Sequence, residues 1–382
     1  MSPGRTFSRM VPLAEIETND FNLNTPRYID STDPEDLQDI DGHLRGGIPD
    51  RDISDLDRYW VVFPSLRSTL FTPFTRPGYF VLKVAQPEIK RAIYEHREFT
   101  SFQQSVTKLF EKWEATQTLV LKEIAVGDKP KKLILALAED LLATFQKAKL
   151  VDPYDVYQHL MDYWAETMQD DLYLLVKEGW KAVLDGKPNI DLIPTTLIVR
   201  RYFAVDQASI EQLEADRDAV TRQMEEADEE HGGDDGLLAD AKNDKGKLTK
   251  ASVKARMEEI STVADMDEER KMLKDYLVLI ETEAIANKTI KEAMKVLDAR
   301  VAAKYIKLTK DEVKILVVDD KWMGTLAAVV QSELNRVSQA LTERIKQLAE
   351  RYSTSLPKLT EEVEALATRV NAHLKKMETT WN

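Results

Sequence analysis

The architecture expected of this chain follows from the segment at residues 210–247, IEQLEADRDAVTRQMEEADEEHGGDDGLLADAKNDKGK. Its first half places apolar residues at steps of three and four in a heavily charged background, which is typical of a long amphipathic helix. Its second half is rich in glycine and aspartate, which favours a turn. Only Arg217 interrupts the apolar series, which consists of Ile210, Leu213, Val220, Met224 and Ala227.

A second amphipathic series with the same spacing follows the turn. Glu283 and Asn287 are polar members of its apolar seam. Two long helices separated by a glycine-rich tip predict an antiparallel coiled-coil arm over residues 205–302, with a further helix starting near Leu248. The second series consists of Leu273, Tyr276, Ile280, Ile290, Met294, Leu297 and Val301.

On the N-terminal side of the arm, residues 57–204 have the pattern of a globular helical domain. Asp152 before Pro153 is a strong helix start, because aspartate caps free amides and proline suits the first turn. Two β-prone segments, residues 172–176 and 192–199, predict a possible small sheet. Residues 1–56 are expected to be an extended segment that docks on something larger, followed by a connector.

On the C-terminal side, residues 303–382 predict two helices for subunit assembly, separated at SLPKL, residues 355–359. Each helix carries one narrow apolar stripe, which the other helix, the arm or helices of another chain must cover. The fold class is therefore mainly α. The residues expected to meet a partner helix are Leu334, Val337, Leu341, Ile345, Leu348, Leu366, Val370 and Leu374.

Composition narrows the class of protein. The chain has 382 residues, 43% of them hydrophobic, and a formal charge of -14, which excludes a disordered protein and argues against broad neutralisation of nucleic-acid phosphates. The absence of cysteine favours a reducing cytoplasm. No apolar run approaches the length needed to cross a bilayer, so no membrane association is expected.

Some segments of the sequence resemble motifs of catalytic, cofactor or metal sites without fitting them. The dinucleotide, P-loop and zinc-protease signatures do not occur in the chain, and its five histidines lack metal-ligand spacing. The glycines of the tip do not fit a calcium loop, so we expect a flexible turn there. KILVVDDKW at residues 314–322 resembles a receiver-domain strand, but the favoured interpretation is a short apolar segment whose acids cap a helix at Lys321.

Several blocks together resemble the C-terminal portion of the modification (M) subunit of bacterial type I restriction-modification systems. They include FSRMVPLAEIETNDFNLNTPRYIDS at residues 7–31, LVDPYDVYQHLMDYWAETMQDD at residues 150–171, and VVDDKWMGTLAAVVQSELNRVSQALTERIKQLAERY at residues 317–352. The most specific item is NDFNLN-x-PRY. The family consists of DNA adenine-N6 methyltransferases that use S-adenosylmethionine.

This resemblance implies an assembly role. The family's cofactor-binding glycine motif and N-P-P-[FY] catalytic motif are not found in this sequence, so we expect no cofactor site and no activity of the chain alone. The implied partners are a specificity (S) subunit, a second M subunit, a nuclease subunit, a separately encoded catalytic half of M, and double-stranded DNA bound through the complex.

Residues of the NDFNLN-x-PRY block are candidates for contacts with DNA, because amides and arginine can bind phosphates or base edges. The alternative is that they pair the backbone of an edge segment. A stand-alone helical scaffold or the relic of a split gene remains the alternative function, and catalysis by an unrecognised site is a third hypothesis. The candidates for contact with DNA are Asn19, Asn22, Asn24, Arg27 and Tyr28.

Overall fold

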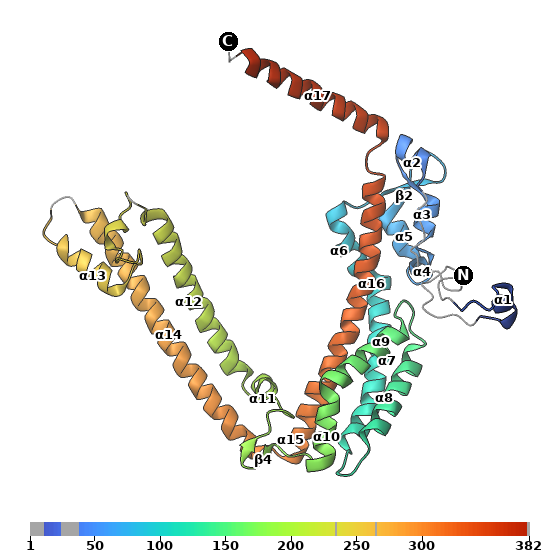
Figure 1. The fold of residues 1–382 in the computed structure, drawn as a ribbon, viewed down its shortest axis with the longest axis horizontal. Coiled ribbons are helices and arrows are strands. Elements are labelled where there is room, and N and C mark those ends of the chain that lie inside the picture. The colour runs from blue at the N-terminus through green and yellow to red at the C-terminus, as the bar shows by residue number, and fades with distance from the viewer. Residues whose placement is uncertain (1–10, 24–37, 234, 264–265, 380–382) are drawn as a thin grey trace. The chain divides into compact units, whose positions relative to one another are not determined.

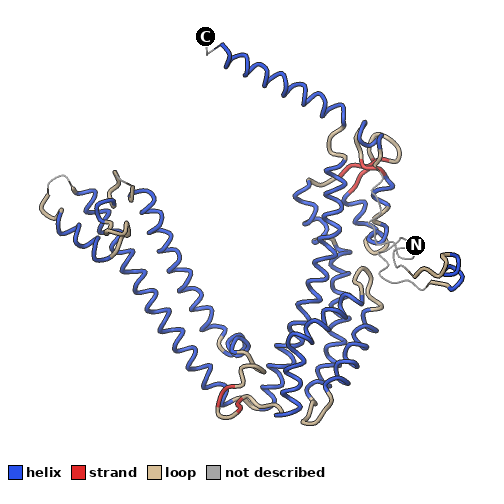
Figure 2. Tube along the Cα trace, viewed as in Figure 1, coloured by secondary structure: helices blue, strands red, loops and turns tan. Residues whose placement is uncertain are grey.

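The computed structural model describes residues 11–23, 38–233, 235–263 and 266–379. Over these residues the fold is mainly helical, with two small antiparallel sheets, as expected for the mainly α class (Figure 2). The chain divides into two compact units. Unit 1 consists of residues 1–100 and 338–382, and unit 2 of residues 101–337.

Unit 1 combines short helices with a three-stranded sheet of order β1-β3-β2. The expected connector is part of its core, because Ile48 and Ile53 are buried. Buried Asp52 accepts a hydrogen bond from the Tyr352 hydroxyl at 2.8 Å. Its elements are α1 (Leu13–Thr18), α2 (Ile40–Arg45), β1 (Ile48–Pro49), α3 (Asp50–Ser54), α4 (Asp57–Trp60), α5 (Pro64–Leu70), β2 (Phe71–Pro73), β3 (Tyr79–Leu82), α6 (Ile89–Tyr94) and α17 (Leu356–Thr379).

The tail expected to be extended contains the short helix α1, so its described part is not extended throughout. The connector approaches the end of α16 closely enough to require glycine. A Cβ on Gly42 of α2 would lie 2.8 Å from Cε1 of Tyr352, well inside van der Waals contact. The connector, expected as a loop dense in Asp and Gly, therefore packs against Tyr352 at a position that only glycine fits.

Unit 2 contains most of the long helices. Helix α9 begins at Pro153, and the Asp152 carboxylate accepts a hydrogen bond from the Tyr154 amide at 2.8 Å, which confirms the predicted start. Helices α7 and α16 contribute residues to both units. The elements are α7 (Arg97–Lys122), α8 (Pro130–Phe145), α9 (Pro153–Tyr163), α10 (Gln169–Glu178), β4 (Val183–Leu184), β5 (Lys187–Pro188), α11 (Thr195–Tyr202), α12 (Ala204–His231), α13 (Lys250–Glu259), α14 (Asp267–Lys307), α15 (Lys310–Lys314) and α16 (Gly324–Arg351).

The predicted pairing of residues 172–176 with residues 192–199 is wrong. The first segment lies in α10 and most of the second lies in α11. In α10, Leu172 and Leu175 are buried three residues apart, so the apolar run fits one helical face. The described strands lie elsewhere, at residues 48–49, 71–73, 79–82, 183–184 and 187–188.

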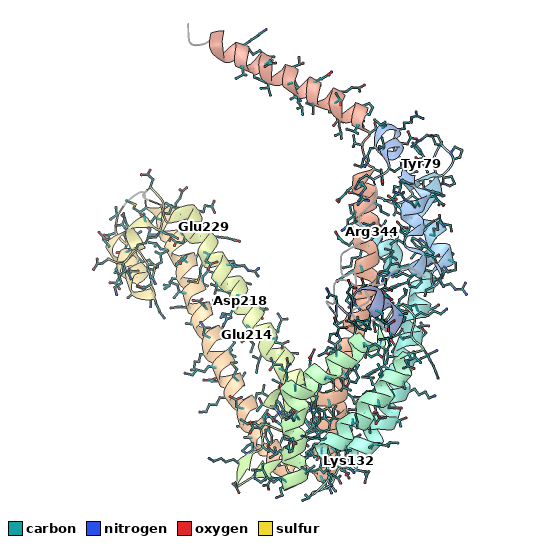
Figure 3. The ribbon with its side chains drawn as sticks, turned by 45° about the vertical axis from the view of Figure 1, so that its right-hand side comes forward. Tyr79, Lys132, Glu214, Asp218, Glu229 and Arg344 are labelled. Atoms are coloured by element: carbon teal, nitrogen blue, oxygen red, sulfur yellow. The ribbon has the colours of Figure 1, made fainter. Side chains whose placement is uncertain are left out.

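The predicted arm is present as α12 packed against α14 in antiparallel orientation (Figure 1). The polar seam residue Glu283 has a hydrogen-bond partner inside the arm, because the Thr221 hydroxyl donates to the Glu283 carboxylate at 2.8 Å. Acidic side chains, including Glu214, Asp218 and Glu229, are distributed along α12 (Figure 3). The arm is therefore held by its own two helices.

The tip of the arm has a small core of its own, which differs from the expected flexible turn. Leu238 and Val253 are fully buried there and pack with side chains of both arm helices. Gly246 adopts a φ of +70°, and the Asn243 side chain accepts hydrogen bonds from the amides of Lys245 and Lys247 at 3.0 Å. Apolar residues within a polar segment thus convert the tip into a folded cap.

The segment KILVVDDKW does not begin a new helix at Lys321. Residues Ile315–Met323 are π-helical and connect α15 to α16 without a break, so the expected cap by its acids is wrong. Asp319 instead pairs with Lys122 at 2.7 Å, and Asp320 pairs with Arg201 at 2.8 Å. The two acids of this segment thus form ion pairs with residues of α7 and α11.

Helix α17 follows α16 after a short break and begins at Leu356, next to Pro357, as the proline predicts. Among the described residues, no helix is both long enough and apolar enough to cross a membrane.

Candidate functional site

The DNA-contact candidates lie in or beside the described part of the N-terminal tail. Asn19 ends α1, and its side-chain amide donates to the carbonyl of Glu15 at 2.9 Å. Asn22 lies in the turn after α1. Asn24, Arg27 and Tyr28 lie outside the described residues. For Asn19 the observed role is local capping, and contact with DNA stays a prediction.

Five of the expected partner-helix residues lie on α16 and are buried by this chain. All five are at most 5% exposed, so their stripe is covered by the chain's own side chains. The surface of this chain does not offer them to another protein, and the periodicity that selected them reflects an internal core. They are Leu334, Val337, Leu341, Ile345 and Leu348.

The other three candidates lie on α17 and have a different environment. Leu366 and Val370 are each 56% exposed and Leu374 is 52% exposed. Leu356, Leu359 and Val363 are also exposed, so the whole described apolar face of the helix is open. We call the residues Leu356, Leu359, Val363, Leu366, Val370 and Leu374 the α17 stripe.

Charges flank the α17 stripe in two blocks of opposite sign. Residues 361–364 contain Glu361, Glu362 and Glu364, whereas residues 369–376 contain three cations and no carboxylate. The side chains of residues 361–376 are exposed throughout. The surface of α17 therefore combines an apolar seam with an acidic first half and a basic second half. The cations are Arg369, Lys375 and Lys376.

A buried polar cluster in unit 2 is the arrangement that most resembles a catalytic centre. The Asp171 carboxylate accepts from the Lys321 ammonium at 2.7 Å and from the Trp322 indole at 2.8 Å. Burial raises the pKa of Asp171, while the bonds from Lys321 and Trp322 oppose that rise. Lys321 also donates to the carbonyls of Asp191 and Leu192, each at 3.1 Å.

Every polar group in this cluster is used in joining α10, the loop before α11 and the π-helical segment. Since both charges are paired and hydrogen-bonded, the cluster has the properties of a structural buried ion pair. The Tyr163 hydroxyl adds a bond to the Lys321 carbonyl at 3.3 Å, and burial raises the pKa of Tyr163 to about 12. We therefore assign the cluster to stability.

A second network connects α9 to α16. Glu333 accepts from His159 at 3.0 Å and from Arg336 at 2.7 Å, and Arg336 also pairs with Asp155. Burial raises the pKa of Glu333, but the bonds from Arg336 and His159 outweigh it, so the pKa lies below its usual value. His159 thus acts as a partner for a buried carboxylate, consistent with a structural histidine.

Two open grooves lie along α11 and the start of α12. The larger, about 660 Å³, is lined by α12 residues such as Val205, Ala208 and Leu213, and the smaller, about 430 Å³, includes Arg200 and Glu211. Binding S-adenosylmethionine requires several convergent polar groups for its amino-acid and ribose parts. The larger groove has mainly aliphatic walls, whereas polar side chains such as Thr195, Arg200 and Glu211 line much of the smaller one. Among the described residues, no group of three or more acids and histidines is placed to hold a metal ion.

No protein-family model, no curated protein and no solved structure matches this chain.

Two features that bear on function were not predicted from the sequence. The apolar periodicity is equally clear on α16 and α17, although only the α17 stripe is exposed. The folded tip was also not predicted, although Leu238 within a polar segment and the Thr249 cap of α13 were available signals. The exposed α17 stripe is the strongest candidate functional surface of this chain.

Proposed function

We propose that this chain is the non-catalytic assembly part of a type I restriction-modification DNA methyltransferase. The observation that carries the proposal is the exposed α17 stripe, with Val363 63% exposed and Leu366 56% exposed. A continuous apolar surface of this kind on a soluble helix marks a protein interaction site. An isolated amphipathic helix also gains much of its stability from packing against another element.

The resemblance of the sequence to M subunits supplies the identity of the complex. In that complex the chain would associate with a specificity subunit, a second M subunit and a nuclease subunit, and would help to enclose double-stranded DNA. Methyl transfer from S-adenosylmethionine to adenine N6 would take place on a polypeptide that carries the cofactor and catalytic motifs. The residues of this chain would supply attachment surfaces.

Co-purification tests this function. The chain is co-expressed with a tagged specificity subunit and the polypeptide encoding the two motifs, and the proposal expects one complex containing all three. Leu366→Asp should reduce recovery of the chain in the complex at least tenfold, because it places a charge in the apolar seam. Thr368→Asp, on the same helix but outside the stripe, is the matched control and should leave recovery unchanged. Failure of the wild-type chain to join such a complex would overturn the proposal.

The second candidate function is a stand-alone coiled-coil scaffold. The arm favours it, because α12 and α14 satisfy their seam within this chain and Leu238, Val253 and Leu273 complete a folded tip. A scaffold of this kind needs no methyltransferase partner. Purification of the chain alone from cells that also express the specificity subunit would support the scaffold and contradict the assembly role.

A further inference from the structure

Helix α14 of the arm carries a second apolar seam, on the side turned away from buried residues such as Val301. Three of its side chains are more than half exposed: Val278 at 54%, Ile285 at 66% and Val296 at 58%. They belong to a repeat with alternating steps of four and three residues, the a/d spacing of a coiled coil, in which Glu292 is the one charged position. We call the exposed residues Val278, Thr282, Ile285, Thr289, Val296, Ala299 and Ala303 the α14 stripe.

The two threonines of the α14 stripe contribute apolar surface. The Thr282 hydroxyl donates to the carbonyl of Val278 at 2.7 Å, and the Thr289 hydroxyl donates to the carbonyl of Ile285 at 2.9 Å. Because each hydroxyl is bonded to its own helix, the threonine methyl group remains for contact with a partner. The apolar surface is therefore continuous from Val278 to Thr289, and the repeat as far as Ala303 extends over about 38 Å.

Cations line one edge of the α14 stripe. Lys274, Lys288 and Lys295 occupy g positions of the repeat, at intervals of fourteen and seven residues. Lys295 has no ion-pair or hydrogen-bond partner among the described residues, and Lys288 makes only a 3.9 Å contact with Glu292 while its side chain is 77% exposed. The acid on this edge, Glu281, is already paired with a lysine of α13 at 2.9 Å. The edge therefore has an excess of unpaired positive charge.

The opposite edge of the stripe carries no carboxylate, because it consists of Leu279, Ala286, Ala293 and Arg300. The chain as a whole has a formal charge of -14. At physiological ionic strength, however, charges farther away than about 8 Å are largely screened, so the nearby lysines set the sign of the potential beside the stripe. Acidic groups of a partner would be attracted there.

We propose that the α14 stripe binds one amphipathic helix of a partner protein, whose apolar seam is flanked by acidic residues. A long, narrow seam with a/d spacing fits a helix, because the apolar side chains of each helix enter the spaces between those of the other. The row of lysines selects acidic flanks. Glu292 selects a cation opposite it and so fixes the register. This inference goes beyond the proposed function, which rests on α17.

A synthetic helix tests the inference with the full chain. The peptide has about four heptads, with leucine at a and d and glutamate at the flanking e and g positions, so it does not pair with itself. Every chain carries Leu366→Asp, because the α17 stripe would otherwise compete for the peptide. Fluorescence anisotropy should show saturable binding, which Ile285→Asp should weaken about tenfold. Ala284→Asp adds the same charge outside the stripe and is the matched control, expected to leave binding unchanged.

Reversing the lysines tests the charge of the partner. The double variant Lys288→Glu/Lys295→Glu should weaken binding of the glutamate peptide about fivefold and strengthen binding of a peptide with lysine at the same flanking positions. Lys291→Glu, on the same helix but outside the edges of the stripe, should change neither. The effect of the double variant should shrink as the salt concentration rises, because the lysines are exposed and salt screens them.

The inference is overturned if Ile285→Asp leaves binding of the glutamate peptide unchanged, or if the charge reversals leave it unchanged. It is also overturned if the chain alone self-associates in sedimentation equilibrium and Ile285→Asp abolishes that association, since a second copy would then cover the stripe. Duplex DNA that binds through the same lysines and displaces the peptide would overturn it as well, by assigning the edge to phosphates. Recovery with the specificity subunit is proposed to depend on α17, so either result here leaves the proposed function standing.

Discussion

Glu312 joins three parts of unit 2 through one carboxylate. Hydrogen bonds from Lys304 at 2.7 Å, from the Thr309 amide at 2.8 Å and from the Tyr202 hydroxyl at 3.0 Å converge on it. The Lys304 bond contributes most to lowering the pKa of Glu312 to about 2. The ionised form is therefore stabilised by folding, and this single residue connects α11, α14 and the start of α15.

A carboxyl group whose pKa is lowered by folding stabilises the fold at pH values above its unfolded-state pKa. This contribution to the free energy of unfolding is lost as the pH falls through the folded-state pKa. Glu312→Gln should lower the free energy of unfolding at pH 7 by about 1 kcal/mol, since partial exposure screens the charge. The difference from wild type should shrink as pH falls from about 4.5 towards 2. Urea unfolding at several pH values measures this. Glu123→Gln, at an exposed carboxylate, should change little, and a pH-independent loss for Glu312→Gln would contradict the role of charge.

Helices α16 and α17 carry the same apolar spacing, but their apolar side chains contribute differently to the free energy of unfolding. Leu341 on α16 is fully buried, whereas Leu366 on α17 is 56% exposed. Leu341→Ala should lower the free energy of unfolding by about 2–5 kcal/mol, because it removes buried contacts and leaves a cavity. Leu366→Ala should change it by less than about 0.5 kcal/mol in the dilute monomer. Chemical denaturation at low protein concentration compares the two, and similar losses would contradict the assignment of α17 as an open face.

At the scale of the whole molecule, the proposed assembly function makes a prediction about the cofactor. Purified alone, it should bind S-adenosylmethionine too weakly to detect by titration calorimetry at millimolar cofactor. The reason is that the cofactor-binding glycine motif of the family that the sequence resembles is not found in this chain. Adding the polypeptide with the cofactor motif should restore binding. Stoichiometric binding by this chain alone would support the third hypothesis, catalysis by an unrecognised site.

Features that depend on neighbouring residues were predictable from the sequence. The start of α9 required only Asp152 and Pro153, because capping is a short-range interaction. The arm was also predictable, because the three- and four-residue spacing extends over many turns and the glycines lie between its two helices. Helical class and arm were therefore properties of local sequence.

Features that depend on distant segments were not predictable in the same way. Residues 172–176 have β-forming side chains, but packing of Leu172 and Leu175 on one side makes them helical. The π-helical segment arises where Asp319 and Asp320 meet Lys122 and Arg201, which are more than a hundred residues away.

The α16 and α17 stripes show the same contrast between local sequence and long-range packing for the candidate site. Periodicity established that each helix has an apolar face needing cover, because water penalises exposed aliphatic surface on either helix equally. Which face is covered depends on the other segments that fold against it, and no spacing within the helix encodes that. Packing within the chain buries Leu341 and leaves Leu366 exposed, so the position of the candidate interface came from the folded chain.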